Sequence, residues 1–319
     1  MTTADTLEIT TSTDYINNMV KGKFITSTVV TSKGVSAVNY ILDHKIDGLQ
    51  RLSVGKTNGV VKIKVSSKIL GLDYPKGISL NTIENVCSKI NKTGIILDTD
   101  FINDSITNLV DVKDDLQLIV GYDKYINSLS LLNNPKFAKT KYTTGITFNE
   151  NIKSTPLRFT CYSKYDEVLS NKKFYHKYPS LVNYFEGLLR LESRFKNRKT
   201  IKKYFNDCDL VSVLTSKDVN LNSLIKVIDN QTNIVSFLNT DEMTNKEEQN
   251  FAQVLYLNNL YDGDFNAIMN HIKSKLSPNT KATYQRNKVK KYLAMISNAE
   301  EIDTISNLKD LENTLKEVY

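Results

Sequence analysis

One short stretch of the sequence places a tyrosine between two cationic side chains. Apolar and polar residues alternate along 157–164, which reads Leu-Arg-Phe-Thr-Cys-Tyr-Ser-Lys, and a period of two is typical of a half-buried strand. Continued one step, the polar face carries Arg158, Tyr162 and Lys164 in a row. Such cations attract a phosphate group and help to lower the phenol pKa from its reference value of about 10. Tyr162 is therefore a candidate nucleophile towards a phosphodiester, and a plain surface tyrosine beside a lysine is the alternative interpretation.

Acidic side chains lie on three other stretches that alternate like strands. Asp5 begins the alternation of residues 5–10, and Asp111 lies on the polar parity of a predicted strand over 108–115. Glu192 lies between Arg190 and Arg194 on a predicted strand over 189–196. Each carboxylate also has an ordinary interpretation: a surface residue for Asp5, a turn cap for Asp111, and for Glu192 a surface ion pair of about 1 kcal/mol or less.

Two basic clusters point to a polyanionic partner. Residues 190–203 contain seven Lys or Arg side chains against the one acid Glu192, and residues 273–291 contain seven more and no acid. Lys and Arg make most contacts to a nucleic-acid backbone, although a charge run is often only a solvated helix face. The residues that we expect to contact DNA are Arg158, Arg190, Arg194, Lys196, Arg198, Lys199, Lys288, Lys290 and Lys291.

The bulk composition is that of a globular protein with a basic balance. The chain of 319 residues is 40% hydrophobic and carries a net charge of +7, long enough for one large or two ordinary domains. No apolar run reaches the length of a membrane span, and the first residues lack the pattern of a signal peptide. Cys87, Cys161 and Cys208 lack metal-binding spacing, so we expect reduced thiols and a cytoplasmic location.

Helical and irregular stretches separate the predicted strands. Apolar residues at helical spacing predict helices from Ser79 to Ile90 and from Tyr122 to Leu132, whereas Asn133 to Thr144 is expected to be a loop. The tyrosine-rich segment from Phe174 to Tyr184 is expected to be irregular. Strand-like alternation gives way to helical spacing near Asn206, which predicts a domain boundary there.

Five motifs occur in an order that resembles the gene II/X type of phage and plasmid rolling-circle replication initiators, related more distantly to the Rep_trans plasmid initiators. The motifs cover about residues 1–205. They are an acidic strand at 5–9, a small-residue strand and helix at 64–70 and 83–90, a second acidic strand at 109–112, a tyrosine-x-lysine-x-x-glutamate motif at 162–167, and an arginine-x-glutamate strand at 189–194. Val110 replaces the arginine that often precedes the second acidic residue, and Ser66-Ser67 lacks the usual glycine.

The resemblance implies a metal-dependent nicking and rejoining enzyme for single-stranded origin DNA. Tyr162 would attack the phosphorus and leave a 5′-phosphotyrosine and a free 3′-hydroxyl; Tyr165, on the apolar parity, is a weaker candidate, and Lys164 would contact the phosphate. The three histidines are widely separated, so no histidine-x-histidine pair can hold the metal. Carboxylates would hold it instead, with Asp111 as the first ligand and Asp5 and Glu192 as partners, which favours Mg²⁺ or Mn²⁺ over Zn²⁺.

We therefore predict an α/β fold of the α+β kind: a largely antiparallel central sheet with helices on one face, followed by a helical C-terminal region. Residues 1–205 would form the catalytic nicking domain and residues 206–319 a helical DNA-binding region. The resemblance implies DNA, as an origin hairpin or single strand, and a host helicase and polymerase as partners in a bacterial cytoplasm, with no membrane. The alternatives are a DNA-binding protein of the same ancestry that does not cleave, and an interaction protein whose basic patches only aid solubility.

Overall fold

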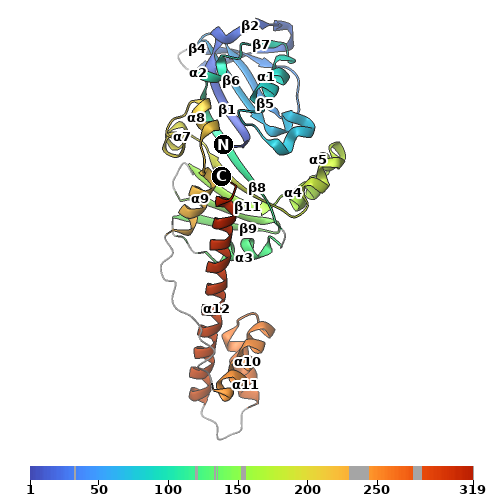
Figure 1. The fold of residues 1–319 in the computed structure, drawn as a ribbon. Helices are drawn as coiled ribbons and strands as arrows, with labels where there is room; N and C mark the ends of the chain where they lie inside the picture. Colours follow the sequence, from blue (N-terminus) through green and yellow to red (C-terminus); the bar gives the residue numbers. More distant parts are fainter. Residues whose placement is uncertain are drawn as a thin grey trace. The chain divides into compact units, whose positions relative to one another are not determined.

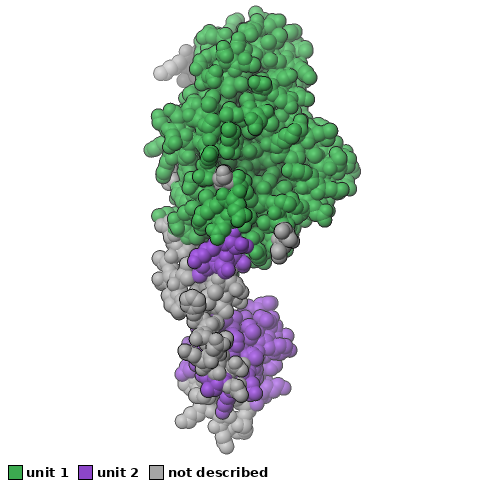
Figure 2. Space-filling view, viewed as in Figure 1, with its two compact units in different colours: residues 1–230, 311–319 green, residues 231–310 purple. Residues whose placement is uncertain are grey.

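The computed structural model describes residues 1–31, 34–118, 121–132, 134, 136–151, 156–229, 244–275 and 282–318. The chain divides into two compact units, residues 1–230 with 311–319 and residues 231–310 (Figure 2). The first unit contains segments from both sides of the predicted boundary near Asn206, since the helices directly after that residue belong to it. The functional division expected at 205/206 stays a prediction.

The first unit is built on a 10-stranded sheet in which all neighbouring strands are antiparallel (Figure 1). The strand order is β3-β4-β5-β6-β1-β8-β12-β11-β10-β9. The strands are β1 (Ala4–Ser12), β3 (Phe24–Thr31), β4 (Gly34–Leu42), β5 (Leu49–Gly55), β6 (Val60–Ser66), β8 (Ile106–Gln117), β9 (Phe137–Tyr142), β10 (Gly145–Glu150), β11 (Leu157–Ser163) and β12 (Leu188–Phe195). The predicted α/β fold with a large antiparallel sheet and a helical C-terminal region is confirmed.

The remaining elements of this unit are a small antiparallel pair and a set of helices. The pair is β2 (Ile16–Met19) with β7 (Ile95–Leu97). The α-helices are α1 (Ile83–Asn91), α2 (Phe101–Asp104), α3 (Asp123–Leu131), α4 (Lys164–Ser170), α5 (Lys172–Lys177), α6 (Pro179–Val182), α7 (Arg198–Phe205), α8 (Leu210–Thr215) and α9 (Val219–Ile228). Short 3-10 helices are η1 (Thr13–Tyr15), η2 (Lys21–Lys23), η3 (Ser67–Lys76) and η4 (Asn183–Phe185).

Alternating burial gives the central strands β8, β12 and β11 two different faces. On β11, Leu157, Phe159 and Cys161 are fully buried while the intervening residues are partly exposed. Apolar side chains of this face pack against helices that follow the sheet in sequence: α9 contacts β8, β11 and β12, and the ring of Phe205 on α7 lies 5.2 Å from that of Phe195. Helices α7–α9 thus cover the apolar face and leave the polar face of the same strands to form a site.

One end of the polar face is covered as well. Leu188, at the start of β12, joins a buried cluster that η3, α4–α6 and η4 supply, with Tyr74, Val168, Phe174, Val182 and Phe185. Aromatic edges hold this cluster together, since the ring of Tyr74 lies 5.3 Å from that of Phe174 and 5.9 Å from that of Phe185. We call this cluster the apolar roof. The polar face is therefore open only beyond it.

The structure corrects two of the expected connections and confirms two helices. The expected loop at 133–144 contains strand β9, which pairs with β10, and the expected irregular segment at 174–184 contains α5 and α6. The sequence did not predict these elements because both segments are polar, and an edge strand or a short amphipathic helix needs few apolar residues. The helix predicted over 79–90 is present as α1, but it begins at Ile83 after Thr82 and is not capped by Ser79; Ile83, Val86, Cys87 and Ile90 form its buried face. The helix predicted over 122–132 is present as α3.

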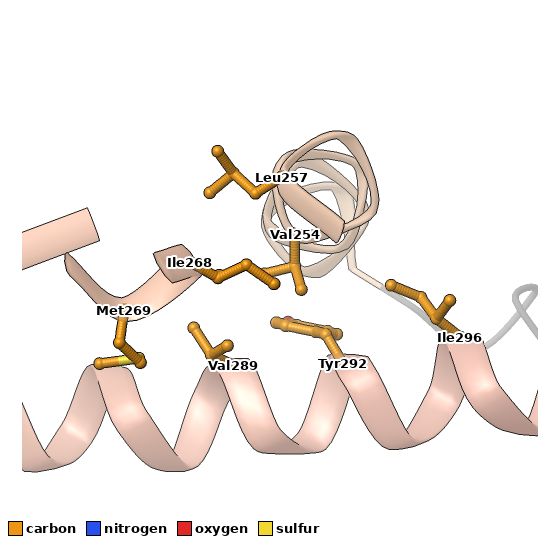
Figure 3. Packing of buried hydrophobic residues seen from close by; sticks show 7 residues of the cluster. All are labelled: Val254, Leu257, Ile268, Met269, Val289, Tyr292 and Ile296. Atoms are coloured by element: carbon orange, nitrogen blue, oxygen red, sulfur yellow. The ribbon is translucent and has the colours of Figure 1, made fainter. Parts of the chain in front are cut away.

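The second unit consists of helices in its described part. These are α10 (Asn245–Leu260), α11 (Phe265–Ser274) and most of α12 (Ala282–Lys316), whose last residues count with the first unit. Their core contains Val254, Leu257, Ile268, Met269, Val289, Tyr292 and Ile296 (Figure 3). Among the described residues, no helix combines the length and the apolar character that crossing a membrane requires.

Candidate active site

The register of three neighbouring strands brings the predicted site residues to one face of the sheet. On β12 and β11, Arg190 lies opposite Tyr162 and Arg194 opposite Arg158. On β12 and β8, Arg194 lies opposite Asp111. Because side chains alternate along each strand, these residues and Glu192 point to the same side. Two further residues of β8 share this side: Lys113 opposite Glu192 and Asp115 opposite Arg190.

Tyr162 and Glu192 form a direct pair at the centre of this face. The phenolic O–H of Tyr162 donates to Oε1 of Glu192 over 2.7 Å. Burial and the Glu192 charge raise the pKa of Tyr162 well above its ordinary value, and the positive charge of Arg190 offsets this only in part. The expectation that neighbouring cations lower the pKa of this phenol is therefore wrong, since the nearest polar partner is a carboxylate.

Asp5 and Glu192 approach the same guanidinium nitrogen. Nη1 of Arg190 lies 3.7 Å from Oδ1 of Asp5 and 3.8 Å from Oε1 of Glu192, and Ser67 donates to Oδ1 of Asp5 over 2.7 Å. Burial and the nearby charge of Asp5 raise the pKa of Glu192. The pKa of Asp5 is lowered, because the charges of Arg190 and Lys164 outweigh the effect of burial. Glu192 is thus the more basic of the two carboxylates.

Arg190 is a structural cation beneath the site. It is fully buried, pairs with both oxygens of Asp115 through Nε and Nη2, and donates from Nη1 to the Tyr74 hydroxyl over 3.2 Å. Lys113 donates to Oδ2 of the same Asp115 over 2.7 Å. A residue that we expected to contact DNA therefore lies inside the protein, where its guanidinium positions carboxylates.

Lys164 does not continue the strand. It is the first residue of α4, because the Ser163 side chain accepts a hydrogen bond from the Asp166 N–H and so caps the helix. The residue is 4% exposed; its Nζ lies 2.7 Å from Oε2 of Glu167 and 5.7 Å from the centre of the Tyr162 ring. The expected row of three polar side chains along one strand is wrong at this position, but the ammonium group still faces Tyr162.

Lys164 is enclosed by aromatic rings. The ring centres of Tyr74 and Phe185 lie 5.4 and 5.9 Å from its Nζ. Burial and the charge of Arg190 oppose protonation, yet Tyr74, Glu167 and Asp5 raise the pKa of Lys164. A protonated ammonium is therefore held beside the phenol. Tyr165, the weaker nucleophile candidate, lies on α4 and packs against the apolar roof instead.

Asp111, predicted as the first metal ligand, is already paired. Both of its oxygens accept hydrogen bonds from Arg194, through Nε and Nη2, and the residue is 2% exposed. Within the described part of the chain, no three His, Cys, Asp or Glu side chains gather in a way that could hold a metal ion. Asp5 and Glu192 approach the same nitrogen of Arg190, and the predicted set of three carboxylate ligands stays a prediction.

Arg158 adds a cation whose Nε lacks a partner. This Nε atom is buried. Arg158 lies opposite Arg194 in the β11–β12 pair. Burial and the charge of Arg194 lower the pKa of Arg158. Further along, Lys196, Arg198 and Lys199 are exposed at the end of β12 and the start of α7.

Several residues of the site were not identified from the sequence. Asp115 and Lys113 share the polar parity of Asp111, which was the available signal, but their buried pairing with Arg190 depends on the β8–β12 register. Tyr74 and Phe185 come from segments far away in sequence and gave no local signal. All of them act through Arg190 or Lys164 and do not face the phenol directly.

Comparison with known proteins supports the resemblance inferred from the motifs. Residues 120–253 match a family model of phage proteins, which is described as the N-terminal part of a replication-associated protein. This range contains Tyr162, Lys164 and Glu192, whereas Asp5 and Asp111 lie outside it. The predicted resemblance to phage and plasmid rolling-circle initiators is thereby confirmed for this part of the chain.

A solved structure, described as that of a rolling circle replication initiator protein from Geobacillus stearothermophilus, is also similar to this chain. The match has 10% sequence identity and a TM-score of 0.33, and it covers 75% of this chain and 88% of that chain. The assignment therefore relies on the family model and on the motifs. A search of curated proteins finds no match.

Proposed function

We propose that this protein is a rolling-circle replication initiator that nicks and rejoins single-stranded origin DNA through Tyr162. The observation that carries the proposal is the Tyr162–Glu192 hydrogen bond of 2.7 Å beside the protonated Lys164. It unites a nucleophile, a proton acceptor and a positive charge in the range that matches the family model. These are the groups that nucleophilic attack on a phosphodiester requires.

The reaction begins with a proton transfer from the phenol. Because the pKa of Tyr162 is raised and that of Glu192 is raised as well, the phenol is protonated at rest and Glu192 is a stronger base than an exposed carboxylate. Oε1 of Glu192 accepts the proton as Tyr162 Oη forms a bond to phosphorus. The P–O3′ bond breaks, and the leaving O3′ takes up a proton from solvent, while Glu192 releases the phenol proton to solvent. The product is a 5′-phosphotyrosine and a free 3′-hydroxyl, and the reverse reaction rejoins the strand.

Fixed positive charge stabilises the extra negative charge of the transition state. Nζ of Lys164 lies 5.7 Å from the centre of the Tyr162 ring, and its contacts with Glu167 and with the rings of Tyr74 and Phe185 restrict its position. Arg158, with its unpartnered Nε, is suited to bind a phosphate oxygen on the same face. Arg190 serves by holding Glu192 and Asp5 in place.

The proposal includes a divalent cation that Asp5 and Glu192 would hold as its ligands. These two carboxylates approach the same nitrogen of Arg190. When bound, Mg²⁺ or Mn²⁺ supplies additional positive charge to the phosphate oxygens. Asp111 would have to exchange its pairing with Arg194 for the cation in order to join them. As further parts of the proposal, the substrate is an origin hairpin or single strand, and a host helicase and polymerase act on the nicked product.

The test is the isolation of a covalent protein–DNA adduct. Wild-type protein incubated with labelled single-stranded origin DNA and Mg²⁺ should form an adduct that survives denaturant, and mass spectrometry should locate it on Tyr162. Tyr162→Phe should abolish the adduct and keep DNA binding. Tyr165→Phe, two residues beyond Ser163 and packed against the apolar roof, is the matched control and should keep the activity. An adduct on another tyrosine would contradict this assignment.

A second candidate is a protein of the same ancestry that binds DNA without cleaving it. One observation favours it: three metal-binding side chains do not come together among the described residues. Absence of any adduct with Mg²⁺ or Mn²⁺, together with unchanged DNA binding by Tyr162→Phe, would select this candidate.

A further inference from the structure

A pocket in the second unit is lined by three lysines. It lies between the start of α10 and α12, with a volume of about 400 Å³. Tyr292 belongs both to the lining and to the hydrophobic core shown in Figure 3, which includes Val254, Leu257 and Val289. The described lining residues are Thr244, Lys246, Glu247, Asn250, Asn287, Lys288, Lys291 and Tyr292.

The positive charge of this pocket is not neutralised by its acidic residue. Oε1 of Glu247 lies 3.3 Å from Nζ of Lys291, and Oε2 accepts hydrogen bonds of 3.2 and 3.1 Å from the backbone N–H and hydroxyl of Thr244. Both oxygens are therefore engaged, and among the described lining residues no further carboxylate remains for Lys246 and Lys288. The lining thus carries three ammonium groups and one carboxylate.

Lys246 and Lys288 also repel each other. Lys288 is half-buried, and burial together with the charge of Lys246 lowers its pKa. The two packed helices hold these two cations close to one another, and their repulsion lowers stability. A bound anion would reduce that repulsion. Lys290, on the neighbouring face of α12, is different: its Nζ lies 5.9 Å from the Phe265 ring centre and outside the pocket lining.

We propose that this pocket binds a phosphate group through Lys246, Lys288 and Lys291. The amide groups of Asn250 and Asn287 provide further donors and acceptors in the lining. The phosphate group belongs to the backbone of DNA, and this choice of source rests on the proposed function. The second unit then binds DNA by a defined contact, and the cluster predicted over 273–291 does not act as a diffuse basic surface.

The test compares full-length variants that lose the same charge. Lys246→Gln with Lys288→Gln removes the pocket cations, Lys246→Arg with Lys288→Arg keeps them, and Lys273→Gln with Lys309→Gln removes two exposed cations of the same unit outside the pocket. The probe is a short fluorescein-labelled single-stranded oligonucleotide, titrated over a range of salt concentrations. The pocket Gln variant should bind more weakly, and its log–log salt slope should fall by about one for each phosphate that it no longer neutralises.

The Arg variant should bind like the wild type, and the control pair should lose much less affinity than the pocket pair. An equal loss in the pocket and control variants would overturn the proposal, because it would show a diffuse charge effect. Thermal unfolding excludes a folding defect: the pocket Gln variant should unfold at the same temperature as the wild type or higher, since the substitution removes like-charge repulsion. A lower unfolding temperature would overturn the ligand interpretation, because the lysines would then be structural.

Two competitors distinguish the sources of the phosphate. Inorganic phosphate and dAMP are added at an ionic strength matched with chloride. Weak competition by these compounds supports a DNA backbone phosphate as the ligand. Strong competition in the wild type but not in the pocket Gln variant overturns DNA as the source, because the ligand would then be a free phosphate or phosphomonoester. Adduct formation at Tyr162 by the wild type is measured in parallel at saturating oligonucleotide. If the wild type forms no adduct but binding still depends on Lys246 and Lys288, the proposed function fails and the pocket proposal stands.

Discussion

At Tyr162 the chemistry depends on where the phenolic proton goes. The nearest acceptor is Glu192, whose pKa is raised by burial and by the charge of Asp5. A carboxylate on the arginine-x-glutamate strand therefore has two assignments in this chain, proton acceptor and metal ligand. Both roles require the ionised carboxylate, so both predict a rate that rises with pH in the acid range.

The nicking rate should rise with pH in the acid range as Glu192 ionises. Since the folded pKa of Glu192 is above its ordinary value of 4.5, the midpoint of this rise should lie above 4.5 as well. Glu192→Gln should lower the rate by about 10²- to 10⁴-fold, the usual contribution of a general base, and remove the acid limb. Single-turnover nicking across pH measures both, with the exposed Glu186→Gln as the control. An unchanged acid limb in Glu192→Gln would assign it to another group.

Asp115 should make stability depend on acid. The charges of Arg190 and Lys113 overcome burial and lower its pKa from 3.8 to about 2. The unfolded chain therefore binds a proton between these values that the folded chain does not, so this stability is present above about pH 4 and is lost as pH falls towards 2. Acid titration followed by circular dichroism should show this loss.

Replacing Asp115 tests the same network at neutral pH. Asp115→Asn should lower the free energy of unfolding by about 3 kcal/mol, because it leaves the buried Arg190 with only Asp5 and Glu192 as more distant acidic partners. Urea denaturation measures the change, and the exposed Asp43→Asn should be nearly neutral. If Asp115→Asn lowers the free energy of unfolding by no more than Asp43→Asn does, the Arg190–Asp115 pairing contributes no stability.

At the scale of elements, the sequence predicted the strands of the site better than their neighbours. Alternation identified β8, β11 and β12 and the parity of Asp111, Tyr162 and Glu192, because a buried face imposes a period of two. The end of β11 was missed although Ser163 and Asp166 form a capping pair at the start of α4. The pairs Arg194–Asp111 and Arg190–Asp115 depend on which residues of β8 and β12 lie opposite each other, and no local pattern sets that register.

The β10–β11 contact should control the position of Tyr162. Gly145 lies opposite Tyr162, and a Cβ at Gly145 would come within 2.3 Å of the Tyr162 Cβ and 2.5 Å of the Cys161 carbonyl oxygen. Gly145→Ala must therefore separate the two strands and displace the phenol from Glu192. A displacement of about 1 Å can lower a rate by about 10²-fold. Single-turnover nicking checks this, and Gly22→Ala, with nothing within 4 Å of the new Cβ, should keep full activity. A fully active Gly145→Ala would show that the strand pair does not set the phenol position.

For the whole molecule, the net charge of +7 is accompanied by exposed cations on both compact units. The first unit carries the exposed Lys196, Arg198 and Lys199, and the second carries Lys288 and Lys291 at its pocket. Two basic surfaces on one chain make binding to a long strand bivalent, because the second contact forms at the effective concentration that the chain imposes. A strand too short to span both surfaces would occupy only one of them at a time.

Removing the cations of either unit should therefore affect long single strands more than short ones. Lys196, Arg198 and Lys199 are replaced by Gln in one variant, Lys288 and Lys291 in a second, and all five in a third. Each phosphate that is no longer neutralised should reduce the log–log salt slope by about one, so the reductions in the first two variants should add in the third. On the long strand each of the first two variants should also lose the avidity of bivalent binding, whereas on an oligonucleotide too short to reach both units the loss should be limited to direct contacts. Fluorescence anisotropy over a range of salt concentrations measures both effects. If strand length makes no difference to the loss of affinity, the two units do not bind one strand together.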